Sequence, residues 1–146
     1  MKISTRTRYG LRAMIDIALY SDQGPVLLKD IAKRQDISMK YLDHIITILK
    51  SAGFVKNAAG GHGGYVLTKP AEKVNVGLVV ESLEGSLAPL ACAENSKGCK
   101  RSGHCVTRKL WVKMSQAMKE SLSLHLSELV ADEKKRIQAE STSYSI

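Results

Sequence analysis

The chain has 146 residues, of which 44% are apolar but only 5% aromatic, and a formal net charge of +8. This length fits one compact domain with a helical extension, built around an aliphatic core. No apolar run is long enough to cross a bilayer or to direct secretion, so a cytoplasmic protein with no membrane partner is expected. The positive charge favours a polyanionic partner such as nucleic acid.

The first predicted helix begins at Ser4 or Thr5, either of which can cap it, and ends near Ser21. Its buried stripe comprises Leu11, Met14, Ile15, Ala18 and Leu19. Three arginines crowd its first half: Arg6, Arg8 and Arg12. Positive charge there opposes the helix dipole, which suggests a role outside folding. We interpret the first two arginines as phosphate contacts, with a solvated helix face as the alternative.

Two short amphipathic helices follow, separated by a tight turn. The first covers about Leu28–Arg34, and the second starts at Ser38, a favourable N-cap, and ends near Ala52. One face of the second helix is apolar: Leu42, Ile45, Ile46 and Leu49. The opposite face is polar: Lys40, Asp43, His44 and Thr47. This pattern is typical of a helix-turn-helix, although helix spacing alone fits an ordinary helical hairpin equally well.

The residues after the second helix decide between these interpretations. Two strand-like runs, Phe54–Lys56 and Tyr65–Thr68, enclose a loop with four glycines: Gly60, Gly61, Gly63 and Gly64. A β-hairpin placed directly after a helix-turn-helix is the wing of a winged helix. The loop lacks the Lys-Ser/Thr ending of a P-loop and leads into a strand, so nucleotide binding is rejected. The sequence predicts a mainly α fold with a small β-hairpin wing.

A predicted helix at Val74–Leu83 completes a DNA-binding domain that we place at residues 1–85. A cysteine segment, residues 86–106, follows with Cys92, Cys99 and Cys105. An odd number of cysteines in a cytoplasmic protein suggests metal or redox chemistry rather than disulfides. Thiolates converging on a metal would organise this polar loop, and they suit an iron–sulfur cluster, zinc or copper(I). The alternative is three unrelated free cysteines.

A long helix is predicted from Thr107 to about Leu122, within a dimerisation region at residues 107–131. One side of it carries large apolar residues: Leu110, Trp111, Met114 and Met118. A second copy packed antiparallel would cover that side and give the two-fold dimer that a palindromic DNA site requires. Part of the helix is expected to fold back on its own domain. We also predict a short helix at Leu124–Ala131, followed by a flexible tail at residues 132–146.

Four stretches together resemble the Rrf2 (Rrf-two) family of bacterial winged-helix regulators: MKISTRTRYGLRAMIDIAL, DIAKRQDISMKYLDHIITILKSAGFV, GGHGGYVL and the three-cysteine segment before Leu110-Trp111. The resemblance covers about Met1–Val130. It implies a homodimer that binds imperfect palindromic promoter DNA, usually as a repressor, with no small-molecule substrate. In cluster-binding members, the three cysteines hold an iron–sulfur cluster that sets DNA affinity. The IscR-like branch implies a [2Fe–2S] cluster, which we favour over [4Fe–4S].

The fourth cluster ligand departs from the family pattern. In the IscR-like branch a histidine three residues after the last cysteine completes the site, and here that position is Arg108. In the nitric-oxide-sensing branch a carboxylate from the partner's first helix serves, and the matching position is Arg8. His104, adjacent to Cys105, is therefore the first candidate. Glu94 is the second candidate, and a small exogenous ligand is a further alternative.

The predicted function is a cluster-dependent repressor of iron–sulfur assembly, iron or redox-stress genes. The residues expected to face the major groove are Ser38, Lys40, Tyr41, Asp43 and His44. The residues expected to reach phosphates or the minor groove are Arg6, Arg8, Lys50, Lys56 and His62. One alternative is a cluster-free repressor of cysteine and sulfur metabolism that a protein partner controls, and another is a zinc-stabilised DNA-binding protein. An enzyme is not expected, because no nucleophile–base constellation is present.

Overall fold

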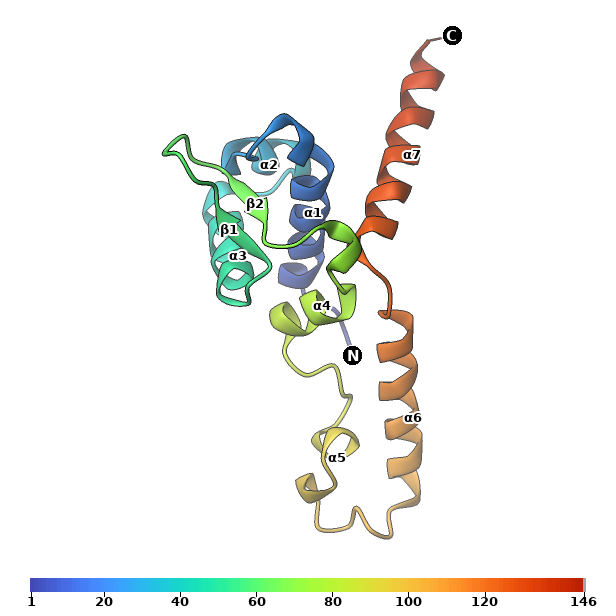
Figure 1. Cartoon of the computed structure of the whole chain (residues 1–146). Coiled ribbons are helices and arrows are strands. Elements are labelled where there is room, and N and C mark those ends of the chain that lie inside the picture. Colours follow the sequence, from blue (N-terminus) through green and yellow to red (C-terminus); the bar gives the residue numbers. More distant parts are fainter. Residues whose placement is uncertain (146) are drawn as a thin grey trace.

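The computed structural model describes residues 1–145 and is mainly helical (Figure 1). Its helices are α1 (Thr5–Tyr20), α2 (Leu28–Gln35), α3 (Met39–Ser51), α4 (Val76–Glu84), α5 (Ala91–Glu94), α6 (Val106–Ser121) and α7 (Leu126–Tyr144). The strands are β1 (Val55–Asn57) and β2 (Tyr65–Leu67), and short 3-10 turns are η1 (Ser21–Gln23), η2 (Ala71–Lys73) and η3 (Ser96–Gly98). The predicted fold class, mainly α with a β-hairpin wing, is confirmed.

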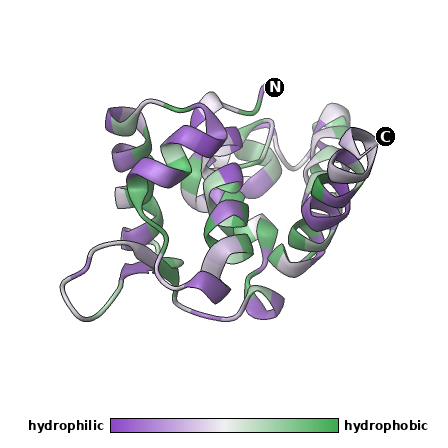
Figure 2. Ribbon diagram, turned by 90° about the horizontal axis from the view of Figure 1, so that it is seen from above, coloured by the Kyte–Doolittle hydropathy of each residue, from purple (hydrophilic) through white to green (hydrophobic). Residues whose placement is uncertain are grey.

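Helix α1 lies at the centre of a winged-helix head, which we define as residues 1–84. Ala13, Met14 and Ile17 are fully buried where α2, α3, α4 and α7 pack around this helix. The apolar stripe predicted for α3 is buried completely: Leu42, Ile45, Ile46 and Leu49. Figure 2 shows the helices gathered around this centre, with the wing and α7 on opposite sides. The aliphatic core expected from the composition therefore forms around α1.

A buried ion pair anchors the end of α2 to α1. The carboxylate of Asp16, which is 1% exposed, accepts hydrogen bonds from Arg34 Nε at 3.0 Å and Arg34 Nη2 at 2.7 Å. Gln35 Nε2 donates a further bond to it at 2.9 Å. The guanidinium carbon of Arg34 lies 4.0 Å from the centre of the Tyr20 ring, and the hydrogen bond to Asp16 raises the pKa of Arg34. The end of α2 is thus fixed immediately before the turn.

The turn between α2 and α3 depends on one unusual backbone conformation. Asp36 adopts φ 53°, the left-handed region that few residues other than glycine, asparagine and aspartate adopt readily. Ile37 then returns to the core with 7% exposure, and the Ser38 hydroxyl caps α3 by accepting the Tyr41 backbone N–H at 3.2 Å. The N-cap predicted at this position is confirmed.

The wing is a short antiparallel hairpin in which Val55, Lys56 and Asn57 pair with Leu67, Val66 and Tyr65 respectively. Four glycines of its loop adopt positive φ: Gly60, Gly61, Gly63 and Gly64. At Gly64 a Cβ atom would also lie 2.8 Å from the Cβ of Pro25. Val26 and Tyr65 exchange two backbone hydrogen bonds of 3.0 and 2.8 Å, so the wing is tied to the segment before α2. This attachment was not predicted.

After α4 the chain leaves the head as an arm, which we define as residues 85–122. Helix α5 packs on α6 within the arm, and Figure 1 shows both helices extending away from the head. Backbone hydrogen bonds close the base: Val76 N–H donates to Leu124 O at 2.9 Å, and Gly77 N–H donates to Leu122 O at 3.0 Å. The returning end of the arm is therefore fastened to the start of α4 on the head.

Helix α7 differs from its prediction. The expected short helix at Leu124–Ala131 instead runs from Leu126 to Tyr144, through most of the segment expected to be a flexible tail. Arg136 stabilises the extra turns through ion pairs with Glu133 at 2.7 Å and Glu140 at 2.5 Å. Serine and threonine hydroxyls in the last turns donate to carbonyls four residues earlier. Residue 146 lies outside the described residues.

The end of α4 is clamped to the start of α1. Glu84 Oε2 accepts hydrogen bonds from the backbone N–H of Ser4 at 3.1 Å, from the Ser4 hydroxyl at 2.7 Å and from the Thr7 hydroxyl. Arg6 Nε donates to the carbonyl of Leu83 at 2.8 Å. The bond from Thr7, followed by that from Ser4, lowers the pKa of Glu84 from its ordinary value of 4.5.

This clamp predicts a contribution to acid sensitivity. Because the pKa of Glu84 is lower in the folded than in the unfolded chain, its stabilising effect is present above the unfolded pKa and is lost as pH falls through the folded pKa. We expect Glu84→Gln to flatten the fall of the unfolding free energy below about pH 4.5, measured by urea denaturation between about pH 3 and 7. Glu81→Gln, one turn earlier on α4, is the control, and an unchanged acid slope in Glu84→Gln would contradict the assignment.

Candidate nucleic-acid interface and cysteine arm

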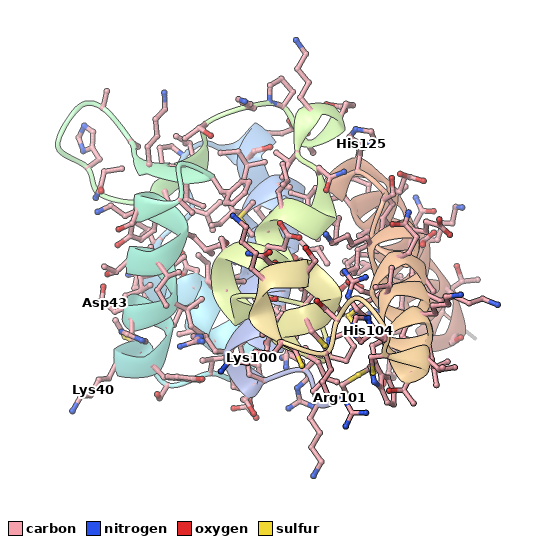
Figure 3. The ribbon with its side chains drawn as sticks, turned by 90° about the horizontal axis from the view of Figure 1, so that it is seen from below. Lys40, Asp43, Lys100, Arg101, His104 and His125 are labelled. Carbon is pink, nitrogen blue, oxygen red and sulfur yellow. The ribbon has the colours of Figure 1, made fainter. Side chains whose placement is uncertain are left out.

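Helix α3 presents polar side chains on the side that faces away from the core. Lys40, Asp43 and His44 are exposed, and Figure 3 shows Lys40 and Asp43 projecting from the outer side of this helix. Together with Ser38 and Tyr41, Lys40 and His44 line a shallow hollow at the start of α3. Cationic, carboxylate and imidazole groups on one exposed helix face can pair with base edges in a major groove. The structure thus places four of the five predicted base-reading residues around one hollow, and the fifth, Asp43, is exposed on the same helix.

Tyr41 is fixed by contacts that the sequence prediction missed. Its ring packs edge-on against Tyr9, with 6.0 Å between the ring centres and 73° between the ring planes. The guanidinium carbon of Arg12 lies 5.2 Å from the Tyr9 ring centre, and Arg12 Nε donates to Gln35 Oε1 at 3.0 Å. Tyr9 and Arg12 therefore connect α1 to both helices of the helix-turn-helix. The sequence signal for this shared contact was the spacing of three residues between Tyr9 and Arg12, which places both on one side of α1.

The predicted phosphate contacts have different environments. Arg8 is exposed, whereas Arg6 is half-buried and bound to the end of α4. Lys50 Nζ lies 6.0 Å from the centre of the Tyr65 ring, which holds it beside the wing. Two further predicted contacts are exposed on the wing: Lys56 in β1 and His62 in the loop. Arg6 serves the α1–α4 clamp in this structure, while the other four side chains lie on the outer surface.

The three cysteines are free thiols distributed along the arm. Cys92 lies in α5, Cys99 follows η3, and Cys105 immediately precedes α6. Within residues 1–145, no group of three His, Cys, Asp or Glu side chains is close enough to hold a metal ion. Other bonds order the loop instead, including one from the Ser102 hydroxyl to the Ser96 carbonyl at 2.5 Å. The sequence-based expectation of converging thiolates is therefore not met in this conformation.

Cys105 has surroundings that favour its thiolate form. A hydrogen bond with the Thr107 hydroxyl at 3.2 Å lowers the pKa of Cys105, and the Arg108 backbone N–H and the charge of Arg101 act in the same direction. Arg108 Nε donates to the carbonyl of Cys92 at 2.8 Å, which links α5 to α6. The residue at the family's histidine position thus acts here as a connection between two cysteine-bearing segments.

The two candidates for a fourth ligand lie on different parts of the arm. His104 is exposed and lines the same shallow hollow as Cys105 and Arg108. Glu94 is engaged at the base of the arm, where its carboxylate accepts a hydrogen bond from the Ser86 hydroxyl at 2.8 Å. Figure 3 shows His104 on the same loop as Lys100 and Arg101. This placement favours His104 over Glu94 as a neighbour of the last cysteine.

Helix α6 packs on the head only near its C-terminal end and leaves apolar side chains uncovered along the rest of its length. Met118 packs with Leu122 against a small cluster of Val76, Val80 and Leu87. The most exposed apolar side chains of α6 are Val106 at 82% and Leu110 at 52%, and the half-buried ones include Trp111 and Met114. Of the four residues predicted to form a dimer contact, Met118 therefore contributes to its own subunit, and Leu110 has the most uncovered surface.

Known proteins resemble this chain over nearly its whole length. The Rrf2 family, described as iron-dependent transcriptional regulators, matches residues 3–132. The protein rrf2 of Nitratidesulfovibrio vulgaris is 44% identical over 133 residues, which cover 90% of this chain and 89% of that protein. The transcriptional regulator IscR of Pectobacterium carotovorum is 37% identical and covers 89% of this chain and 79% of its own length.

Solved structures agree with this family. IscR of T. potens has a TM-score of 0.75 at 34% identity and covers 93% of this chain and 90% of its own. CymR, the global cysteine regulator of B. subtilis, has a TM-score of 0.73 at 36% identity and covers 90% of this chain and 97% of its own. No helix within residues 1–145 has the length and hydropathy that a membrane span requires. The chain belongs to the Rrf2 family of DNA-binding transcriptional regulators, whose members are not enzymes.

Proposed function

We propose that this regulator is a cytoplasmic homodimeric repressor whose affinity for palindromic promoter DNA is set by an iron–sulfur cluster bound to Cys92, Cys99 and Cys105. The observation that carries this proposal is the placement of all three thiols on one arm that is fastened to the head at its base. Similarity to IscR regulators supports the choice of cluster and favours [2Fe–2S] over [4Fe–4S]. The regulated genes would then concern iron–sulfur assembly, iron or redox stress.

The donor set fits a cluster by its chemistry. Three thiols are soft ligands, and the lowered pKa of Cys105 favours the thiolate form that binds iron. His104 would supply a nitrogen ligand beside Cys105. A bound cluster would supply iron that joins these side chains. The chain's own contribution is to carry the thiols on α5 and α6, which Arg108 already links through the Cys92 carbonyl.

The homodimer is proposed from the uncovered side of α6. Val106, Leu110 and Met114 follow one another at intervals of four residues, so they form one apolar strip along the helix. A second copy of the helix would remove this strip from water and set the distance between two α3 helices. A change in the arm would alter that distance and with it the fit to two half-sites, which is a coupling between separate sites.

A cluster-free repressor of sulfur metabolism controlled by a protein partner is the second candidate. It is favoured by the similarity to CymR, a cysteine regulator, and by Arg108 at the position where IscR-like relatives have a histidine. The apolar strip and the exposed arm would then serve the partner. A zinc-stabilised arm with no sensing role is the third candidate.

Metal analysis of the unmodified protein and of its Cys92→Ala variant separates these candidates. We expect anaerobically purified protein to be coloured, with matched iron and acid-labile sulfide, and the variant to lose nearly all iron because one of three thiolates is missing. Ser96→Ala, on the same arm, is the control and should retain its iron. Zinc without sulfide would indicate the third candidate. A protein that stays colourless and metal-free after reconstitution would leave the partner-controlled repressor.

A further inference from the structure

The net positive charge of this chain is densest on the arm. Between Asn95 and Lys119 there are seven lysines and arginines and no acidic residue, so this segment alone carries +7. Residues 1–94 carry a net charge of only +3, and residues 120–146 carry −2. The head, residues 1–84, carries +4 and the shorter arm, residues 85–122, carries +5, so the arm contributes at least as much of the basicity that points to a nucleic-acid partner.

Not every part of the head's reading surface offers a free cation to phosphate. The outer face of α3 includes Asp43, which repels phosphate, and the wing loop from Ala58 to Gly64 contains no lysine or arginine. Arg6 is already bound to the Leu83 carbonyl. Duplex DNA carries about one negative charge per 1.7 Å, so stable binding requires several cations in contact with the backbone. Cations elsewhere on the chain would add to the contacts that Arg8, Lys50 and Lys56 offer.

The cations of the arm are available for such contacts. Those with exposed side chains are Lys97, Lys100, Arg101, Lys109, Lys113 and Lys119. Across residues 1–145, the ion pairs that form involve α1, α2 and α7, and none involves the arm. Arg108 alone among the seven is engaged, with the Cys92 carbonyl. Six unpaired charges on one projecting segment produce a strong local positive potential.

The chemistry of the arm tip distinguishes DNA from an acidic protein as its partner. Residues 95–104 consist of Gly, Ser, Asn, Lys, Arg, His and one cysteine, with no aliphatic side chain and no Phe, Tyr or Trp. Protein interfaces take most of their affinity from buried aromatic and aliphatic anchors, which this segment lacks. Flexible cations among small polar residues are typical of contacts to phosphates, which need charge but no pocket.

The arm tip lies apart from α3 and the wing (Figure 1). In the view from below, Lys40 lies on the outer side of α3, and Lys100 and Arg101 lie on the arm loop between α3 and α6 (Figure 3). The arm also extends beyond the head instead of lying under it (Figure 1). We propose that the tip of the arm, through Lys100 and Arg101, contacts the DNA phosphate backbone outside the segment covered by α3 and the wing.

The test compares two variants that remove the same charge from opposite ends of the molecule. Lys100→Gln/Arg101→Gln neutralises the arm tip, and Lys134→Gln/Lys135→Gln neutralises two adjacent exposed cations of α7. Binding of a labelled duplex of about 40 base pairs of arbitrary sequence is measured by fluorescence anisotropy between about 50 and 200 mM salt. Backbone contacts are independent of sequence, so this probe reports them directly. Circular dichroism confirms folding, and iron and sulfide are measured on each sample.

We expect the arm variant to bind at least about tenfold more weakly at 0.1 M salt, with a slope of log affinity against log salt that is smaller in magnitude by about 2–4. The α7 variant should change affinity by less than about twofold. Equal losses of DNA affinity in both variants would show that only the overall charge of the protein matters, and this would overturn the proposal. An unchanged slope with loss of iron would assign the cations to the cysteine site, and an unchanged slope with iron retained would favour an acidic protein partner; either result overturns it.

Discussion

Replacing Arg34 with alanine is expected to lower the free energy of unfolding by about 2–3 kcal/mol, below the usual range for breaking a fully buried pair. The change removes both guanidinium bonds from the Asp16 carboxylate, which is 1% exposed and would retain only the Gln35 amide. A buried charge without its partner is costly, because water cannot replace the lost donors. The Arg34 side chain is 32% exposed, which moderates the effect. Urea denaturation followed by circular dichroism measures the change.

Arg136→Ala is the matched control for this prediction. Its Nη2–Glu133 distance of 2.7 Å equals the Arg34–Asp16 distance, but the two side chains are 55% and 28% exposed. Surface pairs of this kind contribute little, so a much smaller loss is expected. Adding Asp16→Asn to Arg34→Ala should restore part of the stability, because it removes the buried charge. If Arg34→Ala is no more destabilising than Arg136→Ala, burial does not determine how much the Arg34–Asp16 pair contributes to stability.

Gly10→Val should destabilise the head by about 2–3 kcal/mol, although glycine in a helix interior is normally unfavourable and its replacement often helps. A Cβ atom at this position would overlap Cδ1 of Leu83 and lie 3.1 Å from its Cδ2. Leu83 is 1% exposed in the core, so its side chain has no open space to enter. The close approach of α1 and α4 at this point also aligns Ser4 and Thr7 with Glu84.

A double-mutant cycle tests this explanation. Leu83→Ala alone leaves a cavity and is expected to cost about 2–4 kcal/mol. In the double variant the valine side chain enters the space that Leu83 leaves, so the combined loss should be clearly smaller than the sum of the two. Strict additivity in thermal or urea denaturation would show that the clash does not cause the effect of Gly10→Val.

Local patterns predicted the head well. The stripe Leu42–Leu49, the cap at Ser38 and the glycines of the wing each specify their structure within a few residues of sequence, and all are as expected. The extent of α7 was not predicted, because a Ser/Thr-rich composition is typical of a flexible tail. The spacing of Arg136 with Glu133 and Glu140 indicates a helix instead. That spacing of three and four residues is a helix signal available from the sequence.

The candidate site was less predictable because its contacts join distant residues. Arg6 binds the Leu83 carbonyl 77 positions away, and Arg108 binds the Cys92 carbonyl 16 positions away. From its side-chain type, Arg6 was expected near DNA, and Arg108 was noted only as the residue in place of a histidine ligand. Side-chain type gives no information about the backbone carbonyls that these two arginines bind. The three cysteines were found from sequence, whereas their separation in this conformation follows from the path of the chain through α5 and η3.

The fastened base of the arm has an evolutionary consequence. Because the bonds from Val76 to Leu124 and from Gly77 to Leu122 anchor the returning end of the arm to the start of α4, the arm can change in length or composition while the head keeps its core. Evolution can then substitute one sensing arm for another while the residues of the DNA-reading surface stay unchanged. Such modularity offers a structural route by which a single winged-helix scaffold diversifies into regulators that respond to different signals.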